Sequence, residues 1–494
     1  MAGYKDRDAF AASNEQYEQV RNWLTSAETR ELRHEDVERQ LDVQGRELLR
    51  QLFQDHLDLR SEREPRQDAV EGTDGVVRGS VEQSERQLLT IFGTVRVRRL
   101  AYRARGAPNL HPADAVLNLP AGKYSYGLRK QAAQYAAQTS YDTTLSNVAQ
   151  ATGQSLGKRQ LEASARAATA DFEAFYARGA SGPCGAEDVL VITVDSKGIV
   201  MRPDALRDCT KKYAEGKAPK LLTRGSRGEP RGRKRMATVG AVYDVAPFAR
   251  TAEDVLASSS ACKLSSARPK PRNKRCTVSI VKDLADVVTD LFDEAQRRDP
   301  DRRRRWLVLV DGDWRLLRPI AREAKQRGVA IDIVIDFVHV LEYLWKAAWC
   351  FFKEGDPAAE RWVRKHALDV LRGRSSIVAG AIRRKATALD LSNGQRKNAD
   401  RAADYLIKHA AFLHYDRALA AGYPIATGVI EGACRHLVKD RMDITGARWS
   451  LAGAEAVLQL RTLLANGDFD DYWRFHLDRE YERVHHQRFE GLAA

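Results

Sequence analysis

The sequence lacks a long apolar segment and closely spaced cysteines. The longest apolar run near the middle of the 494 residues is Val189 to Val194, interrupted by one Thr, whereas a membrane-spanning helix needs about 20 apolar residues. The start, MAGYKDRDAF, has no apolar stretch of the kind found in secretory signals. The closest cysteines, Cys262 and Cys276, are too far apart to form the ligand pair typical of zinc sites. These absences predict a protein of the reducing cytoplasm with no membrane span.

Acidic residues are too few to balance the basic ones. Asp and Glu total 67 against 81 Lys and Arg, which leaves a net charge of +14 at pH 7. A basic surplus of this size suits a polyanionic partner, most commonly nucleic acid. Charge for solubility or a coding bias toward Arg is the alternative. Hydrophobic residues make up 43% of the chain, which is a globular fraction, and the length suggests about three domains at roughly 150 residues each.

The N-terminal part is expected to form polar helices followed by a hairpin. Over residues 1–75 an apolar stripe recurs at helical spacing, which indicates a partner helix or a helix packed on its own domain. The stripe comprises Val37, Leu41, Leu48, Leu49, Leu52, Phe53 and Leu57. In 76–103, the apolar segment Leu88–Phe92, then Gly93 and the alternating Thr94–Arg98 predict a β-hairpin. Its Arg side chains would face phosphates or solvent.

A pair of helices is expected around Gly153. Residues 124–180 are Ala-rich with a helical pattern. Gly153 suits the left-handed end of one helix, and Ser155 suits the cap of the next. With Ala149 at the packing position, the pair resembles a helix-turn-helix, although any helical hairpin gives a similar pattern. The side chains that would then face the major groove of DNA are Lys158, Arg159 and Gln160.

From residue 186 the pattern becomes α/β. Apolar runs predict strands at Val189–Val194, Met236–Tyr243, Trp306–Val310 and Val329–Ile335. Helices are predicted at Thr277–Gln296 and Trp314–Gln326 and throughout most of 337–420, with a last helix carrying Gly428 to His436. The basic stretches 202–235 and 264–275 are predicted to be loops.

Acidic residues follow two of the apolar strands directly. Asp195 and Asp311 each stand at the carboxyl end of a predicted strand, where ligand sites of α/β sheets form. Glu431 stands on the last helix. Three converging carboxylates repel one another unless a cation or a proton is present, and hard oxygen ligands suit Mg²⁺. Taken singly, each acid could equally cap a helix or pair with an Arg.

A histidine adds to this set of acids. Asp336 follows the last predicted strand, and His339 stands three residues later, on the same face of a helix. His339 would then contact a scissile phosphate, or it would be an ordinary core histidine.

The residues that carry this chemistry resemble those of a known family. The acids, the Asp-x-x-His of 336–339 and several strings are similar to bacterial insertion-sequence DDE transposases of the ISKra type, related to the Mutator-like branch. The strings are GRKRMATVGAVYDV (232–245), LVDGDW (309–314), DFVHVLEYLWKAA (336–348) and TGVIEGACRHLVKDRM (427–442). The hairpin and YSYGLRKQAAQYAAQTSY (124–141) extend the resemblance to about residue 85, and residues 1–84 carry none.

The resemblance implies an α/β fold with an RNase H-like catalytic domain and an all-α insertion, after a mainly helical DNA-binding region. The expected domains are a polar helical region 1–84, a DNA-binding region 85–180, the catalytic domain 186–339 with 426–465, the insertion 340–425 and a tail 466–494. It also implies that Asp195, Asp311 and Glu431 ligate two Mg²⁺ or Mn²⁺ ions. Asp313 is a rival for the second acid. Arg435 and Lys439 would face the DNA backbone.

The implied activity is DNA transposition. The protein would bind the terminal inverted repeats of a mobile element, cleave double-stranded DNA at its ends and join the 3′-OH to target DNA by two-metal phosphoryl transfer. It would act as a homo-oligomer on DNA in the bacterial cytoplasm, associated with the nucleoid. One alternative is an RNase H-like nuclease or resolvase that cuts without joining. The other is a non-catalytic DNA-binding protein derived from a transposase.

Overall fold

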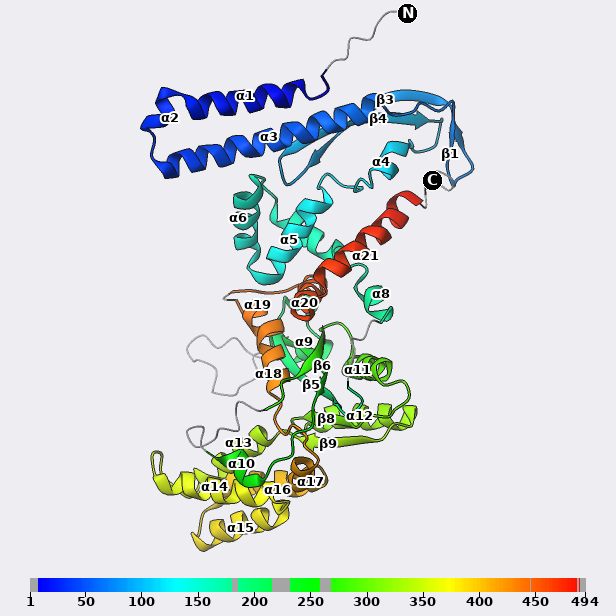
Figure 1. The fold of residues 1–494 in the computed structure, drawn as a ribbon. Helices are drawn as coiled ribbons and strands as arrows, with labels where there is room; N and C mark the ends of the chain where they lie inside the picture. The colour runs from blue at the N-terminus through cyan, green and yellow to red at the C-terminus, as the bar shows by residue number, and fades with distance from the viewer. Residues whose placement is uncertain are drawn as a thin grey trace, which may run out of the picture. The chain divides into compact units, whose positions relative to one another are not determined.

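The protein is mixed α/β and divides into two compact units (Figure 1). The computed structural model describes residues 8–179, 185–215, 232–257, 268–444, 446–486 and 488. The first unit joins Met1–Tyr176 to Gly467–Ala494, and the second comprises Ala177–Asn466. Residues 216–231 and 258–267, which make up much of the two predicted basic loops, lie outside the described residues. None of the helices described is long and apolar enough to cross a membrane.

The first unit contains a helical hairpin, a long β-hairpin and a group of short helices. Its helices are α1 (Ala11–Thr25), α2 (Ala27–Glu31), α3 (His34–Glu62), α4 (Pro112–Val116), α5 (Tyr126–Gln138), α6 (Tyr141–Thr152), α7 (Lys158–Ala167), α8 (Phe172–Ala177), α21 (Phe469–Tyr481) and the π-helical η5 (Glu482–His486). Its strands are β1 (Val70–Glu71), β2 (Val77–Arg78), β3 (Ser80–Leu89) and β4 (Thr94–Arg103). The predicted hairpin is confirmed, because β3 and β4 pair antiparallel with Leu89 opposite Thr94.

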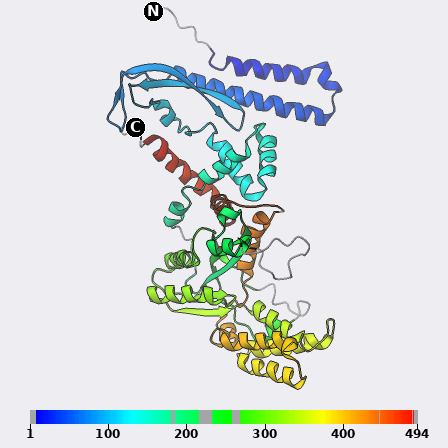
Figure 2. The ribbon, with the colours of Figure 1, turned by 180° about the vertical axis from the view of Figure 1, so that it is seen from behind.

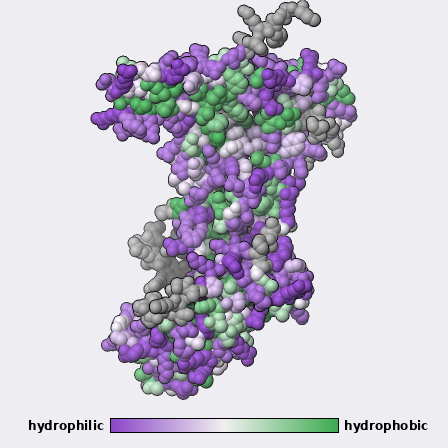
Figure 3. All heavy atoms as spheres, viewed as in Figure 1, coloured by the Kyte–Doolittle hydropathy of each residue, from purple (hydrophilic) through white to green (hydrophobic). Residues whose placement is uncertain are grey.

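One part of the apolar stripe of α3 is buried and another part is exposed. Near the end of the helix, Phe53 and Leu57 pack with the inward side chains of β3 and β4. Leu41 and Leu52 remain 39% and 38% exposed, and Figure 3 shows hydrophobic surface along the α1–α3 hairpin. The stripe is therefore an internal packing surface for only part of its length.

The second unit is built on a five-stranded sheet. Its strands are β5 (Val189–Val200), β6 (Lys234–Val245), β7 (Arg272–Ser279), β8 (Trp306–Val310) and β9 (Ile331–Ile335). Its helices are α9 (Asp208–Glu215), α10 (Ala252–Leu256), α11 (Leu284–Arg298), α12 (Trp314–Arg327), α13 (Phe337–Ala348), α14 (Pro357–Leu371), α15 (Ser375–Ala388), α16 (Asn393–Lys408), α17 (Tyr415–Ala420), α18 (Gly428–Ala433), the π-helical η4 (Cys434–Lys439), α19 (Asp440–Met442) and α20 (Leu451–Asn466), with 3-10 turns η1 (Pro203–Ala205) and η3 (Ala410–Phe412).

The sheet combines an antiparallel and a parallel half. Its strand order is β7-β6-β5-β8-β9. β5, β6 and β7 pair antiparallel, whereas β8 lies parallel to β5, and β9 lies parallel to β8. β5 is longer than β8: its pairing with β8 ends at Thr193 and Leu309, and its pairing with β6 continues to Val200. The sheet therefore forks where β8 ends.

Helices cover both faces of this sheet. On one face, the apolar side of α11 and α12 packs against Leu190, Ile192, Val308 and their neighbours. On the other face, Val191, Leu307 and Leu309 join a core formed with α13 to α17. The two ribbon views agree that α14, α15 and α16 lie together beside α13 (Figures 1 and 2). The helical character predicted for 337–420 is confirmed.

Two local predictions are wrong. Residues 272–279 form strand β7, and the helix predicted from Thr277 begins only at Leu284. The helix is started by Asp283, whose carboxylate and that of Asp286 form a reciprocal capping box. In the basic stretch 202–235, residues Asp208–Glu215 form helix α9 and the strand β6 begins at Lys234.

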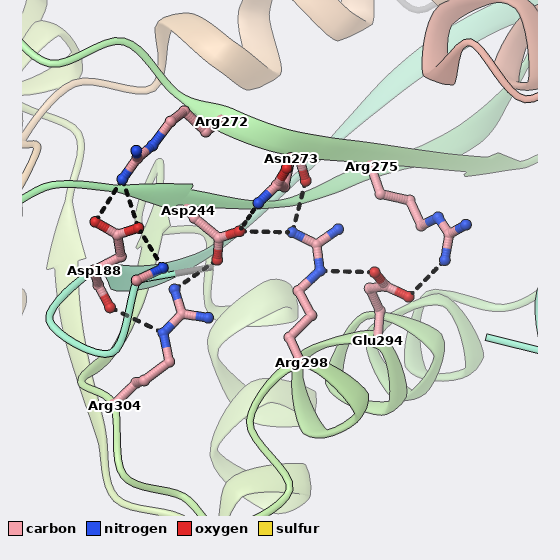
Figure 4. A network of polar contacts seen from close by, with 9 residues as sticks. Asp188, Asp244, Arg272, Asn273, Arg275, Glu294, Arg298 and Arg304 are labelled. Carbon is pink, nitrogen blue, oxygen red and sulfur yellow. Dashed lines mark hydrogen bonds and ion pairs between the residues drawn. The ribbon is translucent and has the colours of Figure 1, made fainter. Parts of the chain in front are cut away.

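A buried ionic network joins the amino ends of the parallel strands to the rest of the sheet (Figure 4). Asp244, on β6, is 1% exposed and accepts a 2.6 Å hydrogen bond from Arg304, which stands two residues before β8. Arg298 lies 3.6 Å from the same carboxylate and donates to Glu294 at 2.7 Å. Arg304 also donates to the backbone oxygen of Asp188, just before β5. The network thus stabilises the end of the sheet opposite the strand-end acids.

We expect Asp244→Asn to destabilise the protein strongly. Removing this charge leaves two guanidinium groups buried without their shared carboxylate, a change that typically costs about 3–5 kcal/mol. Urea unfolding of the second unit measures this loss. The matched control is Asp301→Asn, because Asp301 and its partner Arg303 are 65% and 80% exposed and such pairs contribute at most about 1 kcal/mol. Equal effects of the two changes would contradict this account of the network.

Candidate active site

Three aspartates form one row across the parallel strands. β5 pairs with β8 in a register that sets Leu190 beside Trp306, and the same register carries Asp195 to Asp311. β8 pairs with β9 so that Val310 lies beside Ile335, and the next step aligns Asp311 with Asp336. The Asp336 N–H continues this ladder with a 2.8 Å bond to Val310 O. Asp311 and Asp336 directly follow β8 and β9, whereas Asp195 lies midway along β5, which continues to Val200 instead of ending before Asp195 as predicted. The charge of Asp195 acts on the Asp311 carboxyl, so these two acids lie near each other.

The Asp311 carboxyl has a raised pKa. Burial raises the pKa of its carboxyl, and the charge of Asp195 raises it further. The N–H of Asp313 donates to Asp311 Oδ1 at 2.9 Å. This bond and His339 oppose the rise of the Asp311 pKa. The protein therefore holds two like charges together at a cost to its own stability, which is typical of functional sites.

The rival residue Asp313 has a structural role. It is the N-cap of α12, accepts the Arg315 N–H at 2.9 Å and pairs with the Arg315 guanidinium at 2.6 Å. Arg315 lowers the pKa of Asp313. These bonds occupy the Asp313 carboxylate, so the geometry favours Asp311 as the second acid of the site.

Helix α16 and its C-cap hold the loop that follows Asp311. The Tyr405 hydroxyl donates to Asp311 O at 2.8 Å, and His409 Nε2 lies 2.9 Å from Gly312 O. Gly312 has φ 89°, a left-handed conformation that favours glycine. A Cβ at this position would also lie 3.0 Å from the Tyr405 hydroxyl. Tyr405 and His409, which are far from Asp311 in the sequence, thus help to fix the backbone conformation at Asp311 and Gly312.

Asp336 connects His339 to the helix that carries Glu431. Its buried carboxylate accepts the Thr427 hydroxyl and the Val338 N–H, and it lies 3.6 Å from His339 Nδ1. Burial alone would raise the pKa of Asp336, but His339, Thr427 and the Val338 N–H overcome it and lower the pKa. In turn, Asp336 raises the pKa of His339. Thr427 is the N-cap residue of α18, so Asp336 links the start of α13 to the start of α18.

Glu431 lies on α18, which contacts β5 and β6. Its side chain is exposed. One helical turn later, the buried Cys434 thiol donates to Asp195 Oδ2 at 3.5 Å. Burial first, and then the charge of Asp195, raises the pKa of this thiol, and Glu431 adds to the rise. The structure therefore brings both Asp195 and Glu431 near Cys434, and the role of Glu431 as a third ligand stays a prediction.

The helix containing Glu431 changes pitch immediately after it. Cys434–Lys439 is π-helical, a rare form that is frequent at functional sites. Arg435 and Lys439 are exposed on this segment, and Arg435 lies 3.9 Å from the Asp440 carboxylate. Both cations are accessible to a partner.

Asp195 and Asp311 suit a divalent metal ion. They supply hard oxygen donors. Burial is the main cause of the raised pKa of Asp311, and the charge of Asp195 adds a repulsion that a cation would remove. Among the residues that the structure describes, no group of three or more His, Cys, Asp or Glu side chains is gathered closely enough to hold a metal. The pair thus provides the donors for Mg²⁺ or Mn²⁺, without a complete coordination shell in this conformation.

The predicted helix pair lies in the first unit. Gly153 ends α6 with φ 68° and donates to Ala149 O, as expected. The second helix begins later than predicted, since Gly157 and not Ser155 is the N-cap of α7. Val148, and not the exposed Ala149, packs with Leu161 and with α5. The side chains of Lys158, Arg159 and Gln160 are exposed on the first turn of α7, and Lys158 pairs with Asp142 at 2.8 Å.

Comparison with known proteins adds no relative. No model of a known protein family matches the chain, and no curated protein is significantly similar to it.

We expect Asp311→Asn to stabilise the protein at neutral pH. The folded-state pKa of Asp311 is raised, so its ionised form opposes folding above that pKa, and the effect vanishes below about pH 4, where the carboxyl is protonated in both states. Asn keeps an oxygen for the Asp313 N–H. The melting temperature of the variant should therefore exceed that of the parent at pH 7 and match it near pH 3. The exposed Asp443→Asn is the control and should show no such difference. A lower melting temperature for Asp311→Asn at pH 7 would contradict the assigned repulsion.

Proposed function

We propose that the protein is a metal-dependent DDE transposase that cleaves and joins DNA. The observation that carries the proposal is the parallel register of β5 and β8, which brings Asp195, midway along β5, level with Asp311, directly after β8. The ends of parallel strands, such as that of β8, are where α/β sheets bind ligands. The net charge of +14 supports a polyanionic substrate.

The proposed catalytic fold is RNase H-like with an all-α insertion. An antiparallel set of strands that continues into parallel strands, with acids just beyond the parallel pairing, supports this assignment. Helices α13 to α17, which intervene between Asp311 and Glu431 in the sequence, support the insertion. Their contacts with the loop after Asp311 give the inserted helices a role in shaping the site.

In this mechanism, the protein orients DNA and carboxylates around the reacting phosphate. Two Mg²⁺ or Mn²⁺ ions, when bound, would activate the attacking oxygen and stabilise the leaving oxygen. Asp195 and Asp311 would hold them from adjacent strands, and Glu431 would approach from α18. Water would first attack the phosphodiester and release a 3′-OH. That 3′-OH would then attack a target phosphate, so the joining forms one P–O bond as another breaks.

His339 would donate a hydrogen bond to the scissile phosphate. It is 36% exposed by its side chain and lies beside Asp336, which raises its pKa and so favours the charged, donating form. The charge of Asp311 acts on the same imidazole. His339 therefore lies close enough to both Asp336 and Asp311 to feel the charge of each.

The DNA contacts are proposed for two separate surfaces. The exposed first turn of α7 would meet the major groove at the element ends, and Arg435 and Lys439 would contact the backbone near the acids. Two element ends must be joined to one target, which favours a homo-oligomer on DNA. We place this activity in the bacterial cytoplasm, at the nucleoid.

The acids are expected to be required for cleavage and not for DNA binding. Asp195→Asn, Asp311→Asn and Glu431→Gln should each abolish cleavage of element ends, because removing one metal ligand withdraws several kcal/mol of transition-state stabilisation. Gel-shift affinity should change little. Asp313→Asn is the matched control and should retain cleavage. Full activity of any acid variant removes that residue from the site, and cleavage without joining in a strand-transfer assay would favour the nuclease alternative.

The first turn of α7 is expected to distinguish element ends from other DNA. Lys158→Ala with Arg159→Ala should weaken binding to element ends more than binding to random duplex, because side chains that reach base edges carry about 1–3 kcal/mol of discrimination each. Arg166→Ala, at the exposed far end of the same helix, is the control. Equal loss on both DNAs would assign these cations to the phosphate backbone only.

A further inference from the structure

A cavity of about 690 Å³ adjoins the loop that follows Asp311. The start of α12, the middle of α13 and the end of α16 with the His409 that follows it supply its walls. This volume lies within the range of small-ligand sites, roughly 300–1,000 Å³.

Four aromatic rings form much of the cavity lining. Trp314 is 44% exposed and stacks on His409 with ring centroids 5.5 Å apart. Tyr343 stacks on Tyr405 with centroids 4.0 Å apart and an interplanar angle of 16°. Trp314 is the first residue of α12 and the accessible ring of the set, whereas Tyr405 and His409 are buried.

Three cations surround these rings. Lys346 lies 4.9 Å from the Tyr343 ring and 3.4 Å from Glu342. Arg401 and Lys408 are exposed on α16. The single carboxylate in the lining, Asp404, is paired with Arg383. The cavity therefore combines flat apolar faces with positive charge.

The buried rings also hold the acid loop. The Tyr405 hydroxyl donates to Asp311 O, and His409 Nε2 bonds to Gly312 O. Any ligand that packs against these rings contacts the side chains that position the backbone of Asp311.

We propose that this cavity binds one unpaired nucleotide of the DNA strand, its base against Trp314 and its phosphate near Arg401 and Lys408. The inference rests on the proposed function and specifies its substrate: a strand locally opened beside the acids. Every base offers a flat face for stacking on an aromatic ring, and grooves for single strands pair such rings with cations. A purely apolar ligand would not pair with the three cations, and inorganic phosphate alone would not stack on the four rings.

The test uses a short single-stranded oligonucleotide with a central 2-aminopurine, titrated with the full chain in EDTA so that no metal-dependent cleavage occurs. Stacking in the cavity should quench the 2-aminopurine fluorescence. Trp314→Ala should remove this quenching and weaken binding about tenfold, whereas Trp314→Phe, which keeps a flat ring, should restore most of both. The matched control is Trp349→Ala, because Trp349 is 46% exposed on the same unit but does not line the cavity.

A second pair of variants tests the phosphate contact. Lys408→Ala should weaken binding of the oligonucleotide, and Lys365→Ala, exposed on α14, which supplies no residue to the cavity lining, should not. The same oligonucleotide annealed to its complement should show no dependence on Trp314. Equal quenching by Trp314→Ala and Trp349→Ala, or equal affinity of the two lysine variants, would overturn the proposal.

The proposed function fails in a different way. Asp311→Asn should bind and quench like the parent while losing cleavage. Retained cleavage in Asp311→Asn would contradict the catalytic assignment of Asp311 and would not affect the conclusion drawn from the fluorescence titration.

Discussion

The candidate site depends on how β5, β8 and β9 are paired. Each acid belongs to a different part of the sequence, and only the parallel register aligns Asp195, Asp311 and Asp336 in one row. A shift of one residue between β5 and β8 would turn Asp311 to the opposite face, because successive side chains of a strand alternate. The buried ions around Asp244 at the other end of the strands help to fix this register. The ion pairs around Asp244 therefore stabilise the strands that hold the carboxylates of Asp195 and Asp311 near each other.

The sequence allowed prediction of the strand-end acids but not of their environment. An apolar run that ends in Asp is visible by inspection, as at Val189–Val194 and Trp306–Val310. The contact of Tyr405 with Asp311 O, or of Cys434 with Asp195, joins residues separated by 94 and 239 positions. No local pattern encodes such contacts. The cavity beside Trp314 was missed for the same reason, since three separate helices line it.

The errors in secondary structure have identifiable physical causes. Thr277 to Ile280 was assigned to a helix because Ile280, Leu284, Val287 and Leu291 share one helical face, yet the capping box at Asp283 starts the helix only after the strand has ended. A short apolar segment fits both the helical period of about 3.6 residues and the strand period of about 2. Pairing with a neighbouring strand therefore decides which structure forms. At α7, Ser155 is a plausible cap, but Leu156 packs against the core of α5 to α7, the N-cap is Gly157 and the helix begins at Lys158.

The fork in the sheet changes what supports β5 beside Asp195. The pairing of β5 with β8 ends at Thr193, its pairing with β6 continues to Val200, and Val200 O accepts the N–H of Trp449 at 3.2 Å. Two-stranded ribbons twist more readily than wide sheets. Asp195 thus lies where the sheet narrows to the β5–β6 ribbon, and α18, η4 and Trp449 hold this ribbon on the side where β8 has ended. The helical segment that carries Glu431 therefore replaces β8 as the support of β5 beside Asp195.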